Sequence, residues 1–198
     1  FLLFASAIQL HAQSLSPSNT GVPANTLSFS WTADGSSYFI ALSTAGNFSV
    51  AAATGSLSGA STTYINLTAN ELYYFRVKRA ADGDSAYASN QLSTVTYAAA
   101  PSGPYFISDY FTANSSYSAS VNLGWNTNGN PEWTDYVVGY STDSANINSS
   151  FIEPYPPVDI GGLKANTTYF FKVRAVNLYG NATAETGVIS TATLALKL

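Results

Sequence analysis

The sequence has no cysteine, no methionine and a single histidine. The absence of cysteine excludes disulfides, thiolate nucleophiles and cysteine metal ligands. The absence of methionine leaves the chain without an initiator residue, so we expect a processed product or an incomplete one. The one histidine, His11, lies in an apolar N-terminal stretch, and without a second histidine no Ser-His-Asp set can be assembled. We therefore expect no catalytic residues and a protein that is not an enzyme.

Charged residues are also scarce. Lys and Arg together number 7, Asp and Glu number 11, and charged residues make up 9% of the chain, against roughly 25% in an ordinary globular protein. So few basic residues make no phosphate-binding patch, which argues against a nucleic-acid partner. The hydrophobic content of 46% is too high for a disordered chain. No P-loop, dinucleotide-binding or nucleophile-elbow motif occurs, and we expect no cofactor.

Alternation of apolar and polar residues dominates the chain, and no convincing helical stripe interrupts it. It is clear over residues 27–31, 38–42 and 73–77, where large apolar residues occupy every second position. Clusters rich in Gly, Asp and Ser, such as residues 33–36 and 81–84, separate these segments. Short strands at this spacing, with such turn residues between them, predict an all-β antiparallel sandwich.

The second half of the chain repeats the first. Three segments align at offsets of 94 to 98 positions: 67–77 with 163–173, Trp31 with Trp125, and 38–44 with 136–142. A length of 198 residues suits two domains of about 100 residues each. We therefore predict an N-terminal tail over 1–9, a first domain over 10–98 and a second over 99–198, joined by a short stiff linker with two prolines.

Each half resembles a fibronectin type III domain of the kind common in bacterial and archaeal surface proteins. The resemblance rests on the stretch Leu163-Lys-Ala-Asn166-Thr-Thr-Tyr169-Phe-Phe171-Lys-Val173 and on the segment WNTNGNPEWTDYVVGYSTD that begins at Trp125. It implies two tandem immunoglobulin-like β-sandwiches, preceded here by an extra apolar strand.

The family resemblance also implies roles for four aromatic residues. Trp31 and Trp125 would lie at the centres of the two cores, each burying a large apolar area. Tyr73 and Tyr169 would each form a tyrosine corner, in which the hydroxyl bonds the backbone just upstream.

Few residues stand out as candidates for binding. Trp133 follows Asn130-Pro131-Glu132, where an exposed ring would stack on a sugar or anchor a partner. Tyr155 lies in the stiff segment Glu153-Pro-Tyr-Pro-Pro157, a second candidate contact for a partner or glycan. The two carboxylates of Asp82-Gly83-Asp84 are too few for calcium, which needs six to eight oxygens, so we expect a tight turn and no metal site.

Six Asn-x-Ser/Thr sequons are candidate glycan acceptors, provided that the compartment glycosylates. A chain this rich in Asn, Ser and Thr contains several of them by chance, so their number is weak evidence for glycosylation. The six asparagines are Asn47, Asn66, Asn114, Asn148, Asn166 and Asn181.

The opening stretch FLLFASAIQLHAQ has three interpretations. As a signal peptide it would be cleaved near Leu10-His11-Ala12. As a helix its ten or so apolar residues would reach about 15 Å, about half of the 30 Å needed to cross a bilayer, so we expect no membrane span. As a strand it fits well, since from Ile8 onward apolar and polar residues alternate.

We favour the strand. The first domain has its expected seven strands without residues 1–9. An additional apolar strand of this kind can add to the sheet edge of a neighbouring molecule. Head-to-tail donation does not close on itself and therefore gives a filament. The alternative is that the tail folds back onto the edge of its own first domain. The expected subunit-interface residues are Phe1, Leu2, Leu3, Phe4, Ile8 and Leu10.

The leading functional hypothesis is thus a structural subunit of an extracellular filament or pilus-like surface fibre, a homopolymer whose partners are other copies of itself. Contacts with cell-surface glycans or proteins would be additional. The alternatives are a spacer or adhesion fragment of a larger secreted surface protein, and an accessory module of a secreted carbohydrate-active enzyme. All three place the protein outside the cell or on its surface.

Overall fold

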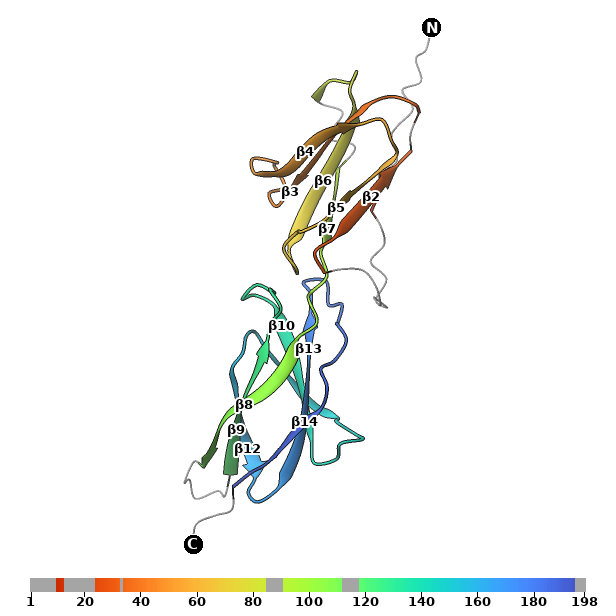
Figure 1. Cartoon of the computed structure of the whole chain (residues 1–198). Helices are drawn as coiled ribbons and strands as arrows, with labels where there is room; N and C mark the ends of the chain where they lie inside the picture. The colour runs from red at the N-terminus through yellow and green to blue at the C-terminus, as the bar shows by residue number, and fades with distance from the viewer. Residues whose placement is uncertain (1–9, 13–23, 33, 85–90, 112–117, 195–198) are drawn as a thin grey trace. The chain divides into compact units, whose positions relative to one another are not determined.

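The computed structural model describes residues 10–12, 24–32, 34–84, 91–111 and 118–194. The chain divides into two compact units, unit 1 (Phe1–Tyr97) and unit 2 (Ala98–Leu198). Both units are built from antiparallel strands, which can be followed in Figure 1. Within the described ranges, no helix combines the length and the apolar character needed to cross a membrane.

Unit 1 contains two sheets, ordered β1-β2-β5 and β4-β3-β6-β7. The alternation predicted around Trp31 is confirmed, because Leu27, Phe29 and Trp31 are buried whereas Ser28 and Ser30 are not. The strands are β1 Leu10–Ala12, β2 Leu27–Trp31, β3 Tyr38–Ser43, β4 Ala51–Leu57, β5 Ser61–Tyr64, β6 Leu72–Arg79 and β7 Gln91–Val95.

The core of unit 1 is rich in aromatic rings from both sheets. Phe29 of β2 stacks on Phe75 of β6 with ring centroids 4.2 Å apart. Trp31 meets Tyr38 of β3 edge to face at 5.6 Å. Offset-stacked and edge-to-face arrangements are the ones that aromatic quadrupoles favour, so these contacts add to the free energy gained by burial alone. Trp31 is a core residue, as the sequence predicted.

Unit 2 repeats this plan with sheets ordered β12-β9-β8 and β11-β10-β13-β14. Its core contains Trp125, which lies 5.2 Å from Tyr136 between ring centroids, and Phe171, which is fully buried. The predicted all-β sandwich is therefore confirmed. The strands are β8 Ser102–Phe111, β9 Ser118–Asn126, β10 Asp135–Ser141, β11 Ser149–Glu153, β12 Val158–Lys164, β13 Thr168–Val176 and β14 Ile189–Ala192.

The duplication extends to the backbone of the turns. Asn70 precedes β6 with a φ of 49°, and its counterpart Asn166 precedes β13 with a φ of 48°. Four positions earlier, Asn66 and Gly162 also match, with φ values of 59° and 73°. Asparagine and glycine are the residues that best tolerate this left-handed conformation. Both sequon residues Asn66 and Asn166 therefore have a backbone role in addition to any glycan.

Candidate functional site

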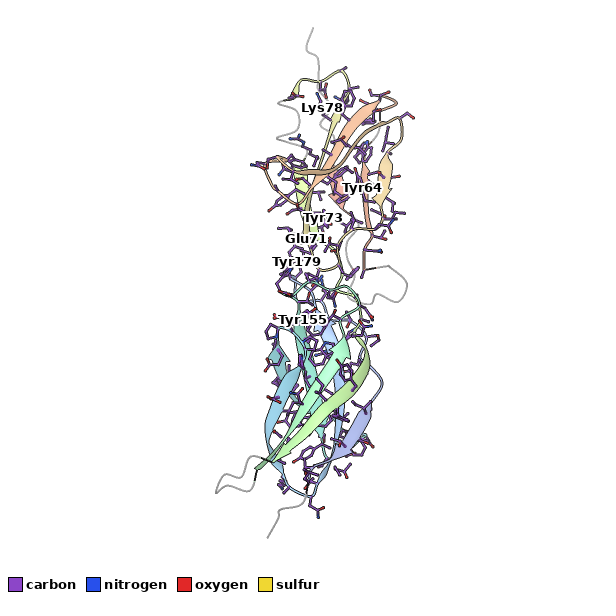
Figure 2. The ribbon with its side chains drawn as sticks, turned by 60° about the vertical axis from the view of Figure 1, so that its left-hand side comes forward. Tyr64, Glu71, Tyr73, Lys78, Tyr155 and Tyr179 are labelled. Atoms are coloured by element: carbon purple, nitrogen blue, oxygen red, sulfur yellow. The ribbon has the colours of Figure 1, made fainter. Side chains whose placement is uncertain are left out.

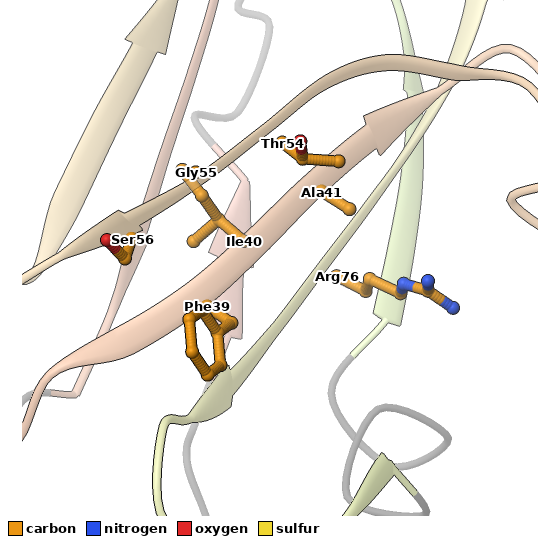
Figure 3. A pocket seen from close by; sticks show the side chains of 7 residues that line it. All are labelled: Phe39, Ile40, Ala41, Thr54, Gly55, Ser56 and Arg76. Atoms are coloured by element: carbon orange, nitrogen blue, oxygen red, sulfur yellow. The ribbon is translucent and has the colours of Figure 1, made fainter.

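A shallow groove of about 390 Å³ lies on the outer face of the β4-β3-β6-β7 sheet of unit 1 (Figure 3). It crosses three strands and is called here the Phe39 groove. Its lining residues are Phe39, Ile40, Ala41, Thr54, Gly55, Ser56 and Arg76.

The register of the three strands explains the lining of the Phe39 groove. Ala41 of β3 pairs with Thr54 on one side and Arg76 on the other. One row further along, Phe39 pairs with Ser56 and Lys78. Small side chains in the middle and large ones at the margin leave the hollow between them. Because Phe39 is 40% exposed, the groove has an aromatic wall open to solvent.

The basic residues beside the groove already make contacts. The guanidinium carbon of Arg76 lies 4.1 Å from the centroid of the Phe48 ring, and Lys78 Nζ lies 5.5 Å from that of Phe39. Both are cation–π distances. Lys78 Nζ also donates to Asp84 Oδ1 and to the carbonyl of Asp82, each at 2.9 Å.

The Asp82-Gly-Asp84 turn is therefore tied to basic side chains. The Lys78 ammonium, which donates to Asp84, holds the pKa of that carboxyl below its ordinary value. Arg79 Nη1 lies 3.7 Å from Asp82 Oδ2. Among the described residues, no group of three or more His, Cys, Asp or Glu side chains could hold a metal ion.

The equivalent face of unit 2 is filled. Gly139 pairs with Lys172 as Ala41 pairs with Arg76 in unit 1. A Cβ atom on Gly139 would lie 3.1 Å from Ile147 Cγ2 and 3.4 Å from Lys172 Cε, so these two side chains cover the position. Lys172 Nζ in turn pairs with Glu185 at 2.8 Å. The two halves thus share a fold and differ in this surface.

The predicted donor segment falls largely outside the described residues. Phe1, Leu2, Leu3, Phe4 and Ile8 lie there, and their interface role stays a prediction. Leu10 is among the described residues. It begins β1, which pairs with β2 of the same chain and sets Leu10 opposite Trp31.

One end of unit 2 gathers the predicted contact residues. Trp133, 55% exposed, lies in the turn between β9 and β10, and Tyr155, 40% exposed, lies between β11 and β12. Both segments leave the same end of the sandwich, because Tyr136 pairs with Glu153. Tyr179, 56% exposed, follows β13 at this end, as Figure 2 shows.

Sequence reasoning missed Tyr179 and Phe39 as exposed aromatics. Tyr179 follows a strand of alternating residues and belongs to a turn that starts at Asn177, where Asn177 Oδ1 accepts from the Tyr179 N–H at 3.1 Å. That asparagine was the available signal. For Phe39 the available signal was the alternation over residues 38–42, which places Phe39 on the face opposite Tyr38 and Ile40.

The sequon asparagines differ in exposure. Asn47, Asn66, Asn148 and Asn166 are exposed, and Asn181 is half-buried. Asn47 Oδ1 accepts a hydrogen bond from the Ser49 N–H at 3.0 Å. Asn114 lies outside the described residues.

Comparison with curated proteins finds a relative in Chitinase A1 of Niallia circulans. The two are 28% identical over 186 residues, which is 89% of this chain and 25% of the relative. The chain therefore spans a quarter of the length of the curated relative that it matches.

Among solved structures, a two-domain fibronectin type III segment of chicken tenascin matches with a TM-score of 0.49 and 14% identity, over 92% of this chain and 95% of that one. The sixth fibronectin type III domain of the human fibronectin type III domain containing protein 3 matches with a TM-score of 0.35 and 22% identity, over 49% of this chain and 86% of that one. The family model of the fibronectin type III domain matches residues 109–191. The match covers most of unit 2.

Proposed function

We propose that the chain is a pair of non-catalytic β-sandwich modules that act as an accessory and spacer segment of a secreted, carbohydrate-active protein. The observation that carries this proposal is the similarity to Chitinase A1, which extends over 89% of the chain and over both units. Unit 1 would be a second fibronectin type III domain, as its repeat of unit 2 in sequence and sheet order suggests. The bacterial surface setting and the extracellular location belong to the same proposal.

The way the connecting chain enters unit 2 supports a spacer role. Ala98 is buried in the core of unit 2. Asn130 bonds both backbone polar groups of the next residue, Ala99. It accepts from the Ala99 N–H at 2.7 Å and donates to the Ala99 carbonyl at 2.8 Å. Asn128 donates to the carbonyl of Ala100 at 2.7 Å. A chain that is hydrogen-bonded on entry resists fraying when the module is pulled.

A linker replacement in the full-length protein tests the proposal. Residues 1–198 are exchanged for a Gly/Ser linker of equal reach, and hydrolysis is compared on insoluble polysaccharide and on soluble oligosaccharide. We expect activity on the insoluble substrate to fall severalfold and activity on the soluble one to stay unchanged, because a spacer matters only where the enzyme works on a surface. The proposal is contradicted if the linker variant and the wild type hydrolyse the insoluble substrate at the same rate. It is also contradicted if residues 1–198 alone hydrolyse either substrate.

The aromatic end of unit 2 is a second candidate function, as a contact for the polysaccharide. Trp133 and Tyr155 are exposed at the same end, and exposed rings stack on sugar faces. In a pull-down of this chain on insoluble chitin, Trp133→Ala and Tyr155→Ala should reduce the bound fraction. Tyr105→Ala, which removes a ring that is 52% exposed on β8, is the matched control. Equal binding of all three variants excludes this contact.

A further inference from the structure

The edge strand β4 of unit 1 is open to pairing. β4 stands at one end of the sheet order β4-β3-β6-β7, and among the described strands it pairs only with β3. Its residues Ala51, Thr54, Gly55 and Ser56 are exposed. The backbone N–H and C=O groups on the side of β4 that faces away from β3 are therefore a template for another strand.

Edge strands are normally protected by charged residues or proline, and β4 has neither. Its seven residues read Ala-Ala-Ala-Thr-Gly-Ser-Leu. The equivalent edge strand of unit 2, β11, ends in Glu153, and prolines follow at 154, 156 and 157. Among the edge strands that the structure describes, β4 is the longest one free of charge and proline.

The side chains of β4 leave room for large neighbours on both faces. On the outer face Thr54 and Ser56 are short, and beyond them lies the Phe39 groove. On the inner face Gly55 has no side chain, and a Cβ atom added there would lie 3.9 Å from Ile40 Cγ1, an ordinary contact distance. An added strand alternates its side chains between these two faces. The β4 edge is therefore shaped for a strand with bulky apolar residues on both faces.

Residues 1–9 of the chain have that character. Phe1, Leu2, Leu3 and Phe4 place bulky apolar groups at four successive positions, and no residue of the segment is charged. Nine residues also suffice to pair along all seven positions of β4. Large donor side chains over small acceptor side chains are complementary in volume.

The geometry favours a donor from a second copy. β1, which follows this segment, lies against β7, at the opposite edge of the sheet from β4. Three strand spacings separate the two edges, about 14 Å. Nine extended residues span about 30 Å, so roughly half of the segment would be used before it reached β4 of its own copy. A segment from another copy can lie along the whole strand.

We infer that the β4 edge of unit 1 accepts residues 1–9 of a second copy of this chain as an added strand. The contact is heterologous, so it extends into a linear assembly unless geometry closes it. The inference is independent of the accessory role proposed above, which needs no self-association.

Disulfide cross-linking tests the pairing. Because residues 1–198 contain no cysteine, a disulfide can form only between the introduced cysteines. The Leu3→Cys variant of residues 1–198 is mixed with the Ser56→Cys variant of the same residues under mild oxidation. We expect a disulfide-linked heterodimer. Ser149→Cys, at an exposed position of β11 in unit 2, is the matched control and should cross-link at least tenfold less. Equal cross-linking at both positions overturns the inference. The inference is also overturned if a double variant, Leu3→Cys with Ser56→Cys, forms its disulfide only within one chain at low protein concentration, because residues 1–9 would then pair with β4 of their own copy.

Sedimentation of variants of residues 1–198 supplies a second readout. The wild-type chain should show a mass that rises with protein concentration. Thr54→Lys puts a charge on the exposed face of the β4 edge and should return the chain to a monomer, whereas Ser149→Lys, at an exposed position of β11, should sediment like the wild type. A wild-type chain that stays monomeric, or association that persists unchanged in Thr54→Lys, contradicts the inference. Circular dichroism verifies that each variant is folded.

Discussion

The hydroxyl of Tyr73 accepts a hydrogen bond from the backbone N–H of Thr68 at 3.0 Å. In unit 2 the hydroxyl of Tyr169 accepts from the Lys164 N–H at the same distance and the same separation along the chain. Both tyrosine rings are buried. The tyrosine corners predicted from the sequence are therefore present in both units, and each ties β6 or β13 to the chain five residues upstream of its tyrosine.

Removing either corner hydroxyl should destabilise its unit. In Tyr73→Phe and Tyr169→Phe a partly buried N–H loses its acceptor, which costs about 1 kcal/mol and up to about 3 if no water replaces it. Urea unfolding followed by intrinsic fluorescence measures the change. Tyr179→Phe, which alters an exposed ring, is the control. Equal stability of Tyr169→Phe and Tyr179→Phe would show that the corner contributes nothing.

Truncation of the core tryptophan should be severe. Trp31 is 4% exposed and contacts the rings of Tyr38 and Phe75, so Trp31→Ala leaves a large cavity. We expect a loss of about 3–5 kcal/mol, a large part of the roughly 5–15 kcal/mol of a typical domain. Ile65→Ala, at a residue that is 65% exposed, should change the unfolding free energy by no more than about 0.5 kcal/mol. Calorimetry of the two variants measures both; similar midpoints would contradict the assigned core.

The two units should differ in one response to acid. In unit 1 the buried Tyr38 hydroxyl donates to Asp34 Oδ1 at 2.7 Å, whereas in unit 2 the Tyr136 hydroxyl accepts from the amide of Asn130 at 3.1 Å. The bond from Tyr38, with further ones from Ser36 and Arg79, holds the pKa of Asp34 well below its ordinary value. A lowered folded-state pKa contributes stability that is present above the unfolded pKa of about 3.9 and lost as the pH falls through the folded value.

Asp34→Asn tests this contribution. The variant should melt below the wild type at pH 7, and the difference should shrink as the pH falls below about 4. Thermal unfolding between pH 7 and pH 2 gives the comparison. A difference that stays constant over this range would mean that the charge on Asp34 is not what stabilises the turn.

Loss of the Asn130 amide should weaken the start of unit 2. Asn130 is 5% exposed and bonds both ends of the Ala99 peptide as well as the Tyr136 hydroxyl. Asn130→Ala leaves these groups without that partner, which costs about 1–3 kcal/mol. Ser102→Ala removes an exposed hydrogen bond from the Ser102 hydroxyl to Asn128 Oδ1 and should cost less. Hydrogen exchange at the Ala99 amide measures the local effect. Unchanged protection in Asn130→Ala would show that the Asn130 side chain does not hold the Ala99 backbone in place.

Some features followed from the sequence because they depend on local periodicity. Alternation around Trp31 identified one core strand, since successive side chains of a strand point to opposite faces, and the repeat placed Trp125 at the equivalent position. The tyrosine corners at Tyr73 and Tyr169 were expected from the resemblance to the fibronectin type III family, and the repeat placed one in each half of the chain.

Other features could not be read from the chain. Residues 51–57 are Ala-rich and show no alternation of large and small residues, so the strand β4 and its open edge were not predicted. The segment 1–9 was recognised as a candidate donor, but its acceptor required the order of strands in the sheet. Tyr105 on β8 and Phe39 on β3 are both exposed, and the sequence alone did not tell whether another segment covers the faces on which they lie.

The sequence alone determined the fold class, the duplication and the central core residues, because hydrophobic periodicity and repeat spacing are properties of the chain itself. Tertiary structure decided where the surface is open: it set Ala41 between Thr54 and Arg76, covered Gly139 with Ile147, and left β4 at an edge. The physical reason is that a sheet's edges and hollows arise from cross-strand neighbours, and pairing brings those together from segments far apart in the sequence.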